Sequence, residues 1–411
     1  MIGFAALIDL IRRYRTLHNP PATEPESSFG PFPIRFGILG ASRIAPDALI
    51  IPAKSHPDVV VSAIAARDEL KALAFKRKHN IESLYCGRNP YERLLDNPDV
   101  DAVYISLPNG LHFEWAMRAL EMGKHVLLEK PSTDTAENTK RLFEFAEQRN
   151  LVLMEAFHYR FHPAIQRVKE IIESGEIGAI KSIDAKMSIP ASIFLKPDDI
   201  RFKYELGGGS IMDLGCYAIH AMRYLTGSDP LEVTSATVDL VPGTTNVDRG
   251  ATASLVFPGV IGSMDLHLYR PWKWGIIPSL PQFPLKVTGE KGEVELTFFL
   301  LPHMLHSITV SVQDEKAPKG VKVRTEQAFK PKDENMKGED WWSTYRYQLE
   351  AFVDKLKGRT PQTWITPEDS IANMEAIEMV YKKNGLGPRP KSEFMLPPHF
   401  PRGSDAVLNT L

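Results

Sequence analysis

The feature of this sequence that most constrains its fold is a regular alternation of strand-length apolar runs and helical segments in the first half of the chain. The apolar runs are 34–39, 59–66, 102–107, 125–129 and 151–156. The segments of helical periodicity are 70–79, 111–121 and 137–149. Such alternation is typical of α/β proteins with a parallel sheet, because each parallel connection needs a crossover helix. The pattern therefore predicts a doubly wound Rossmann sheet, which binds nucleotides at the carboxyl ends of its strands.

A glycine turn follows the first of these strands directly. Its residues are Gly40-Ala41-Ser42-Arg43-Ile44-Ala45, so Ser42 stands where the dinucleotide fingerprint G-x-G-x-x-G/A has its second glycine. A turn at this place brings backbone N–H groups and a helix N-terminus up to a pyrophosphate, and Ser42 would add a hydroxyl donor. We expect Gly40, Ser42, Arg43 and Ile44 to contact a bound dinucleotide.

The choice of coenzyme depends on the pair Arg67-Asp68, which follows the second strand. The adenosine ribose lies at this point of the fold, where an acid favours the free 2′-hydroxyl and an arginine accommodates a 2′-phosphate. The pair is compatible with both coenzymes, and a solvated loop without such a role is a further alternative. Because Arg67 is the first residue after the strand, we predict NADP, with NAD as the alternative.

The second half of the chain has a different pattern. Its predicted helices are 164–174, 211–225, 341–357 and 367–384, and its predicted strands are 180–189, 233–241, 251–257, 260–268, 285–289 and 293–298. The strands alternate and are separated by turn residues, as in an open, mostly antiparallel sheet. We therefore expect an N-terminal tail and linker (1–33), an NAD(P)-binding Rossmann domain (34–156) and an α+β substrate domain (157–411).

The N-terminal tail has helical spacing of its apolar residues, which are Phe4, Leu7, Ile8, Ile11 and Tyr14. Three arginines follow the apolar run, whereas a secretory signal carries its positive charge in front. The run is also about half the roughly 20 residues that a membrane span requires. We predict a short amphipathic helix docked on the protein body. A loose contact with a membrane surface and an organellar presequence are the alternatives.

Two groups of side chains are candidates for chemistry. Lys130, in Glu129-Lys130-Pro131, ends the fourth strand at the edge where a nicotinamide would lie, and its cation would lower the pKa of a neighbouring acid. After a run of glycines, the helical spacing of about 100° per residue brings Tyr217 and His220 within about 40° of Asp213. Tyr217 can relay a proton if a cation lowers its pKa, and His220 is the alternative base. The alternative for Lys130 is a surface lysine without a catalytic role, and that for His220 is a capped or surface histidine.

Composition excludes several classes of function. Lys and Arg number 49 against 51 Asp and Glu, so the charge offers no footprint for nucleic acid or for an anionic membrane. The two cysteines, Cys86 and Cys216, lie far apart and do not form a disulfide framework, which favours a reducing, cytoplasmic location. The sequence has no metal-ligand motif, no nucleophile elbow and no P-loop, so we predict no metal and no hydrolase or NTPase activity.

Taken together, these residues resemble the Gfo/Idh/MocA oxidoreductase family over residues 34–390. The motifs that carry the resemblance are the glycine turn, Leu107-Pro108-Asn109 with His112, Glu129-Lys130-Pro131, Tyr159-Arg160-Phe161-His162-Pro163, Asp213-Leu214-Gly215-Cys216-Tyr217, and 367–386. The Asp-x-Gly-x-Tyr motif is similar to the branch that holds NADP-dependent D-xylose dehydrogenases and dimeric dihydrodiol dehydrogenases. Relatives of inositol dehydrogenase carry a histidine in place of Tyr217.

The resemblance implies roles for residues that spacing alone leaves open. It implies that Lys130 and Tyr217 are the catalytic pair with Asp213 near the substrate. The residues it implies at the cofactor also include Pro108, Asn109, His112 and Glu129, and those at the substrate are Arg160, Phe161 and His220. It further implies a homodimer joined through the open faces of the second sheets.

The expected reaction is NADP-dependent oxidation of a pyranose such as D-xylose at C1, giving the lactone. A trans-dihydrodiol or carbonyl substrate handled by the same Lys-Tyr pair is the alternative. An alternative of another class is an NAD(P)-binding sensor or scaffold without turnover, since some proteins keep a fold and lose its chemistry.

Overall fold

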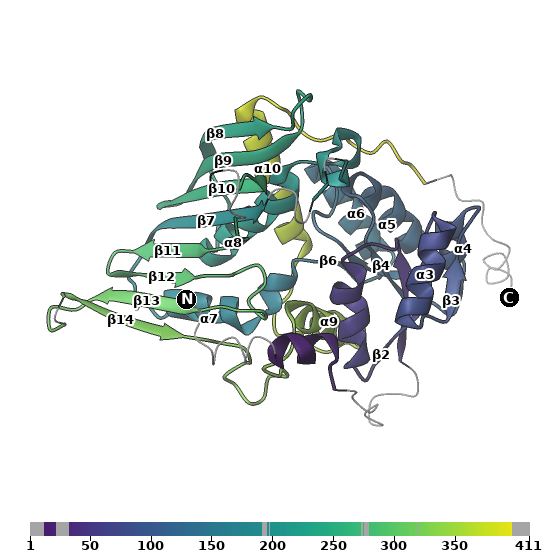
Figure 1. Ribbon diagram of the computed structural model, residues 1–411, viewed down its shortest axis with the longest axis horizontal. Helices are drawn as coiled ribbons and strands as arrows, with labels where there is room; N and C mark the ends of the chain where they lie inside the picture. Colours follow the sequence, from purple (N-terminus) through teal and green to yellow (C-terminus); the bar gives the residue numbers. More distant parts are fainter. Residues whose placement is uncertain are drawn as a thin grey trace, which may run out of the picture.

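The computed structural model describes residues 12–21, 33–190, 195–196, 198–272, 274, 279–317 and 319–396. Within these residues, two sheets form the two halves of the molecule, and helices lie between and around them (Figure 1). The predicted pairing of a parallel Rossmann sheet with a large, mostly antiparallel sheet is confirmed.

The first sheet has six parallel strands in the order β3-β2-β1-β4-β5-β6. They are β1 Ile34–Leu39, β2 Val59–Ala65, β3 Ser83–Tyr85, β4 Ala102–Ile105, β5 His125–Leu128 and β6 Leu153–Glu155. The associated helices are η1 Pro46–Ile50, α2 Ile51–Lys54, α3 Glu69–His79, α4 Pro90–Leu95, η2 Asn109–Leu111, α5 His112–Glu121 and α6 Ala136–Gln148. The sequence analysis missed β3 and α4, because three and six residues are too few to show a period.

The second sheet has eight strands in the order β14-β13-β12-β11-β7-β10-β9-β8, and β7 and β10 form its parallel pair. The strands are β7 Ile180–Pro190, β8 Glu232–Leu240, β9 Asp248–Phe257, β10 Val260–Arg270, β11 Leu285–Gly289, β12 Gly292–Leu296, β13 Ile308–Gln313 and β14 Val321–Glu326. The sequence analysis missed β13 and β14. In β14 the apolar Val321 and Val323 are exposed, so the strand lacks a buried apolar face that a pattern would detect.

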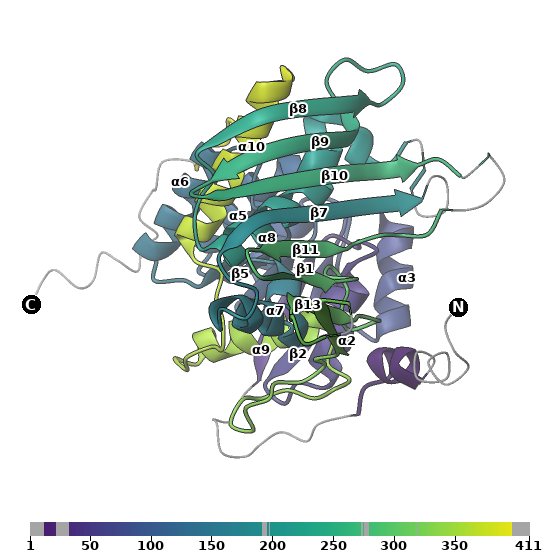
Figure 2. The same ribbon diagram turned by 90° about the vertical axis from the view of Figure 1, so that its left-hand side faces the viewer.

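Helices cover one face of the second sheet and leave the other face bare, as Figure 2 shows for β7, β8, β9 and β10. On the covered face lie α7 Pro163–Glu173 and α8 Cys216–Thr226. The outward side chains on the bare face are largely polar and paired across strands. Lys186 Nζ lies 2.8 Å from Asp265 Oδ2, and the Thr237 and Thr252 hydroxyls lie 2.7 Å apart.

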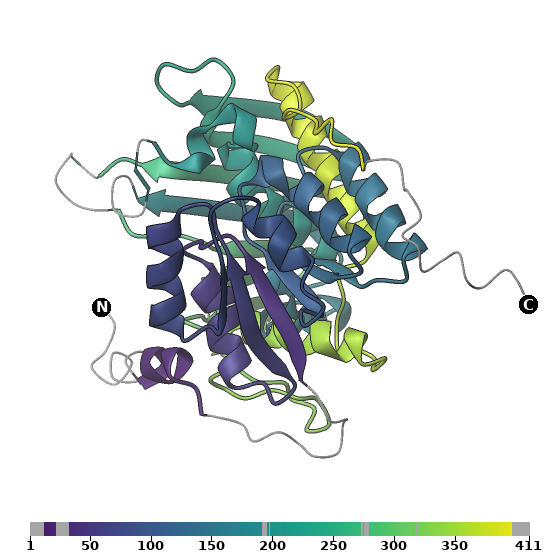
Figure 3. The ribbon, with the colours of Figure 1, turned by 90° about the vertical axis from the view of Figure 1, so that its right-hand side faces the viewer.

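The two C-terminal helices pack back against the first sheet. In α9 (Thr344–Leu356) the Phe352 ring lies 5.9 Å from that of Phe36 in β1. In α10 (Pro367–Asn384) the Glu378 carboxylate accepts the Ala136 N–H, which begins α6, at 2.8 Å, and Figure 3 shows the two helices side by side. Residues beyond 156 therefore complete the helical layers of the first sheet.

The described part of the N-terminal tail is helical over residues 12–18 and contacts the protein body. Leu17 is buried, and the Arg13 guanidinium lies 3.5 Å from the centre of the Phe329 ring. His18 Nε2 is 4.0 Å from Asp47 Oδ1. These contacts agree with a docked helix, although Phe4, Leu7, Ile8 and Ile11 lie outside the described residues. Among the helices that the structure describes, none is long and apolar enough to cross a membrane.

Candidate active site

The turn after β1 has the shape that a bound dinucleotide requires. Gly40 has φ +101°, and a Cβ there would lie 3.0 Å from Leu107 Cδ2 and 3.2 Å from the Ser106 carbonyl oxygen. A side chain at Gly40 would therefore be strained and would crowd the adjacent loop. The Ser42 Oγ accepts the Ala45 N–H at 3.2 Å, so Ser42 caps the start of the next helix while its hydroxyl proton stays available to a phosphate.

At the ribose end of the site, Asp68 caps a helix and Arg67 is exposed. The Asp68 carboxylate accepts the Lys71 N–H at 3.0 Å and caps α3. Arg67 is exposed after β2 and lies beside Tyr91. The acid therefore caps the helix through one of its oxygens, while the arginine is exposed at the same corner of the sheet.

The loop after β4 is tied to the loop that carries Lys130. The buried His112 ring places Nδ1 2.8 Å from the Pro131 carbonyl oxygen and Nε2 2.8 Å from that of Leu107. Burial lowers the pKa of His112 to about 4. Next to Pro108, the Asn109 amide donates to the Gly207 carbonyl at 3.0 Å and so bridges to the second half of the chain. The geometry makes His112 a link between loops.

Glu129 lies just before Lys130 but faces the interior of the sheet. Its carboxylate accepts the Tyr104 hydroxyl at 2.5 Å, and its residue is 9% exposed. Burial raises the pKa of Glu129. The Glu129 side chain is therefore hydrogen-bonded to Tyr104 of β4 and does not point toward the surface of the sheet edge at Lys130.

Lys130 is the centre of a charged cluster at the carboxyl edge of the first sheet. Its peptide bond to Pro131 is cis. Its Nζ donates to Asp213 Oδ1 at 2.8 Å and to the Asp213 carbonyl at 2.9 Å, and it lies 4.8 Å from the centre of the Tyr217 ring. Burial alone would lower the pKa of Lys130, but the Asp213 carboxylate outweighs it and the pKa is raised. Lys130 is therefore an ammonium ion at neutral pH.

Asp213 lies on a wider helical turn than the sequence analysis assumed. The predicted helix 211–225 begins with a π-helical turn, η6 Ile211–Gly215, and continues as α8. Burial opposes ionisation of Asp213, yet Lys130 and Arg201 hold the pKa of its carboxyl well below the usual range. Asp213 is thus a carboxylate between two cations and is a poor proton acceptor.

Tyr217 lies beside Lys130 in an aromatic environment. The Tyr217 ring packs edge to face against Phe157, His158 and Tyr159, with ring centres 5.6, 5.6 and 5.9 Å away. In the described part of the chain, no residue forms a hydrogen bond with its hydroxyl. Burial raises the pKa of Tyr217 well above its ordinary value. The phenol is therefore neutral, and its hydroxyl is available to a substrate oxygen.

The structure does not bring His220 together with Asp213 and Tyr217 at Lys130. His220 is 1% exposed, its ring stacks on Phe157 at 4.1 Å, and its Nδ1 lies 2.7 Å from the Tyr159 hydroxyl. Burial lowers the pKa of His220 well below its ordinary value. Tyr217 and His220 both lie in the regular helix α8, three residues apart, so their side chains leave the helix axis in directions about 60° apart.

Arg160 and Phe161 also lie away from Lys130, in the 3₁₀ turn η3 His158–Phe161. The Arg160 guanidinium lies 3.6 Å from the centre of the Tyr224 ring and 3.7 Å from Asp369 Oδ2. Phe161 is 2% exposed and belongs to the core. Both residues pack the second half of the chain around η3.

Sequence reasoning missed Arg201, which enters the cluster from η4 Ile200–Phe202. Its Nε donates to Asp213 Oδ2 at 2.9 Å, and its Nη1 donates to Asp199 Oδ1 at 3.1 Å. No spacing rule connects a loop arginine with a carboxylate twelve positions later, so the contact is a product of the tertiary fold.

Sequence reasoning also missed two buried carboxyl groups, Asp134 and Glu155. Burial raises the pKa of each to about 7. Both are near the loop that follows Lys130, and neither belongs to a motif that the sequence analysis used.

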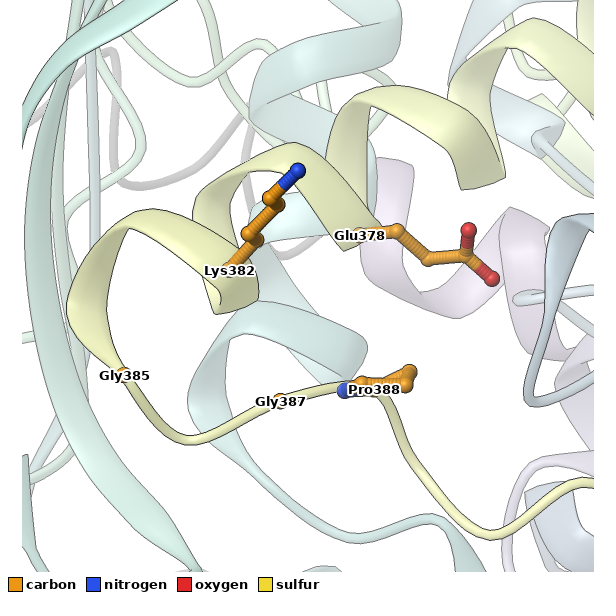
Figure 4. A pocket seen from close by; sticks show the side chains of 5 residues that line it. All are labelled: Glu378, Lys382, Gly385, Gly387 and Pro388. Atoms are coloured by element: carbon orange, nitrogen blue, oxygen red, sulfur yellow. The ribbon is translucent and has the colours of Figure 1, made fainter.

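Two hollows lie elsewhere among the described residues, apart from Lys130 and Tyr217. Among the described residues, no group of three or more His, Cys, Asp or Glu side chains could hold a metal. One hollow of about 350 Å³ lies where Glu378 and Lys382 of α10 stand above Gly385, Gly387 and Pro388 (Figure 4). Another, of about 420 Å³, lies beside α9. Neither is lined by Lys130 or Tyr217.

Comparison with known proteins matches both halves of the chain. Residues 34–157 match the model of an oxidoreductase family with an NAD-binding Rossmann fold, and residues 165–295 match the GFO/IDH/MocA C-terminal domain. A D-xylose 1-dehydrogenase (NADP⁺) of Haloferax volcanii is 34% identical over 86% of this chain and 98% of its own length. A trans-1,2-dihydrobenzene-1,2-diol dehydrogenase of Xenopus tropicalis is 34% identical over 49% of this chain and 59% of its own length.

Among solved structures, the 3-ketoreductase KijD10 of Actinomadura kijaniata, in complex with NADP and TDP-benzene, superposes with a TM-score of 0.69. It is 28% identical over 86% of this chain and 98% of its own. Variants of that enzyme with a tyrosine replaced by phenylalanine and with a lysine replaced by alanine have also been solved.

An NAD-binding Rossmann sheet joined to this second domain defines an NAD(P)-dependent oxidoreductase. The sequence match to the D-xylose 1-dehydrogenase covers 98% of that enzyme's length at 34% identity, whereas a shared fold alone requires no such identity. The chain belongs to the Gfo/Idh/MocA oxidoreductase family.

Proposed function

We propose that this chain is an NADP-dependent sugar oxidoreductase that oxidises a pyranose such as D-xylose at C1 to the lactone, with Lys130 and Tyr217 as its catalytic pair. The observation that carries the proposal is the Lys130 ammonium, held by Asp213 and 4.8 Å from the Tyr217 ring centre at the edge of the Rossmann sheet. The choice of sugar is supported by the D-xylose dehydrogenase, which is matched over 98% of its length.

The choice of NADP is supported by the turn after β1 and by the ribose end of the site. The positive φ of Gly40 and the lack of room for a Cβ fit a loop that lies close to a pyrophosphate. Arg67 is exposed while Asp68 caps α3, which fits a 2′-phosphate. NADP bound there would supply the hydride acceptor for alcohol oxidation, or the donor in the reverse direction as NADPH.

The residues of the chain have distinct tasks in this proposal. Tyr217 exchanges a proton with the reacting oxygen of the substrate, and Lys130 orients that oxygen with its charge. Asp213 holds Lys130 in place by accepting two hydrogen bonds from its ammonium, one at the Asp213 carboxylate and one at the Asp213 carbonyl. His220 is sealed against Phe157 and Tyr159, which supports Tyr217 as the proton carrier.

The raised pKa of Tyr217 makes the two directions of the reaction respond differently to pH. Reduction of a carbonyl needs the neutral phenol as acid, and burial keeps that form at neutral pH. Oxidation of an alcohol needs the phenolate as base, so the rate of oxidation should rise as the pH increases.

A second candidate function is reduction of a carbonyl group by the same pair. It is supported by the neutral Tyr217 phenol and by the superposition on a 3-ketoreductase. A trans-dihydrodiol substrate is a weaker alternative, since the chain matches 59% of the length of that dehydrogenase. A screen for NADPH formation with aldoses, polyols and trans-dihydrodiols, and for NADPH consumption with keto sugars, separates these substrates. Bound coenzyme without turnover of any of them would favour a sensor or scaffold.

The Tyr217→Phe variant tests the mechanism. It removes one hydroxyl, so the fold should lose at most about 1 kcal/mol, whereas kcat should fall by about 10²–10⁴. NADPH binding, followed by fluorescence, should change little. Lys130→Met should do similar damage, and the double variant should be little worse than either single variant because the pair acts as a unit. A crippled His220→Ala enzyme beside an active Tyr217→Phe enzyme would transfer the role to His220.

We also propose a homodimer that forms through the bare face of the second sheet, in the cytoplasm. The cross-strand polar pairs give that face an ordered surface for a second copy. Both cysteines are free thiols, which fits a reducing compartment. Light scattering of the purified protein should give twice the chain mass of 46.1 kDa.

A further inference from the structure

Arg201 joins the catalytic cluster as part of a row of alternating charges. The row is Asp199, Arg201, Asp213 and Lys130, with contacts of 3.1, 2.9 and 2.8 Å between successive partners. The side chains of Asp213 and Lys130 are 15% and 12% exposed, whereas that of Arg201 is 39% exposed. Arg201 is therefore the most exposed member of the row, since the Asp199 side chain at its end is 14% exposed.

The two cations do not compete for the same oxygen of Asp213. Lys130 takes Oδ1 and Arg201 takes Oδ2, so the plane of the carboxylate is fixed from both sides. Ion pairs that are shielded from water interact strongly. Because the single negative charge of Asp213 is shared by Lys130 and Arg201, it neutralises each of the two cations less than it would neutralise one alone. The Lys130 ammonium therefore keeps more of its positive field for the cleft than it would in a pair with Asp213 alone.

The backbone fixes Arg201 in relation to the helix that carries Asp213. The Arg201 carbonyl accepts the Gly209 N–H at 2.9 Å. A Cβ at Gly208 would lie 2.7 Å from the carbonyl oxygens of Arg201 and Lys203, so this contact leaves no room for a side chain. The glycine run that precedes η6 thus serves to seat the arginine loop directly against the site helix.

We propose that Arg201 is a positioning residue that acts through Asp213, holding its carboxylate so that Lys130 presents its ammonium to the reacting oxygen. The proposal rests on the function proposed above for Lys130 and Tyr217. Arg201 has no contact with Tyr217 in the described structure, and its Nε and Nη1 donate to two carboxylates.

Kinetics of Arg201→Ala provide the first test. We expect kcat to fall at least tenfold, while the KM of the substrate and the affinity for NADPH stay within about twofold, because no contact with either is lost. Guanidinium ion added at millimolar concentration should restore part of kcat, since it can replace the missing partner of Oδ2. Arg324→Ala is the matched control, because Arg324 in β14 is also a partly exposed, doubly paired arginine. A raised KM with unchanged kcat would instead make Arg201 a substrate-binding residue and overturn the proposal.

A titration that needs no substrate keeps this inference separate from the proposed function. Selective ¹³C labelling of aspartate carboxyls, with the Asp213 signal identified by its loss in Asp213→Asn, reports ionisation of Asp213 directly. In Arg201→Ala the midpoint should rise by at least one pH unit, and Arg324→Ala should leave it unchanged. A shifted midpoint in an enzyme that turns over no sugar or carbonyl compound would refute the proposed function alone. An unshifted midpoint would refute the coupling through Asp213.

Discussion

The effect of pH on stability tests whether the buried carboxyl group of Glu155, near Lys130, is protonated in the folded protein. The residue ends β6, is 1% exposed, and its Oε1 accepts the Ser132 N–H at 2.7 Å in the loop that follows Lys130. Burial raises the pKa of Glu155 from its ordinary 4.5 to about 7, against the effects of Ser370, Ser132 and Arg223. The folded protein therefore holds a proton on Glu155 that the unfolded chain releases.

The sign of the effect on stability follows from this difference. A carboxyl with a raised pKa contributes stability that is fully present below about pH 4.5 and is lost as the pH rises through 7. At about 1.4 kcal/mol for each unit of pKa, the loss is about 3 kcal/mol. Glu155→Gln mimics the protonated form, keeps an oxygen for the Ser132 N–H and removes the titration.

Urea unfolding of both proteins at about pH 5 and about pH 8.5 measures this quantity. The variant should be more stable by about 1 kcal/mol at the lower pH and by about 3 kcal/mol at the higher pH. Glu137→Gln is the control, because Glu137 is exposed and its pKa is lowered by Lys391, so its effect lies below this pH range. A difference between wild type and Glu155→Gln that stays constant with pH would show that Glu155 is ionised in the fold and that the reasoning is wrong.

Two further predictions concern the coenzyme and the tail. If Arg67 binds a 2′-phosphate, Arg67→Ala should raise the KM for NADP about tenfold or more and that for NAD much less, and equal effects in initial-rate kinetics would refute NADP as the natural coenzyme. Deletion of residues 1–33 should leave a soluble enzyme with a lower melting temperature, because β1 starts at Ile34 while Leu17 and the cover over Phe329 are lost. Aggregation or lost dimerisation in light scattering would show that the tail is essential to the structure.

Much of the fold could be predicted because its signals are local. The segment Phe36–Leu39 of β1 is buried within a parallel sheet and carries no polar side chain, and Gly40 adopts a backbone angle that other residues avoid. Strand β14 escaped prediction because Val321 and Val323 are exposed at the edge of the sheet, so burial imposes no alternation on it.

The candidate site could be predicted in part. Lys130 and Tyr217 lie in motifs, and the structure brings them together at one edge. His220 seemed equivalent to Tyr217 by spacing, yet its stacking on Phe157 and its contact with the Tyr159 hydroxyl place it in the core. Arg201 was missed because an arginine in an irregular loop has no period to reveal which carboxylate it will meet.

The sequence by itself determined the two classes of sheet, the glycine turn at Gly40 and the placing of Lys130 just after strand β5. Those features depend on periodicity and on backbone sterics, which act over a few neighbouring residues. The tertiary structure alone decided that α9 packs on Phe36 and that Arg201 shares Asp213 with Lys130. These contacts join parts of the chain through packing and hydrogen bonding, whose partners are chosen only when the whole chain competes for the same buried space.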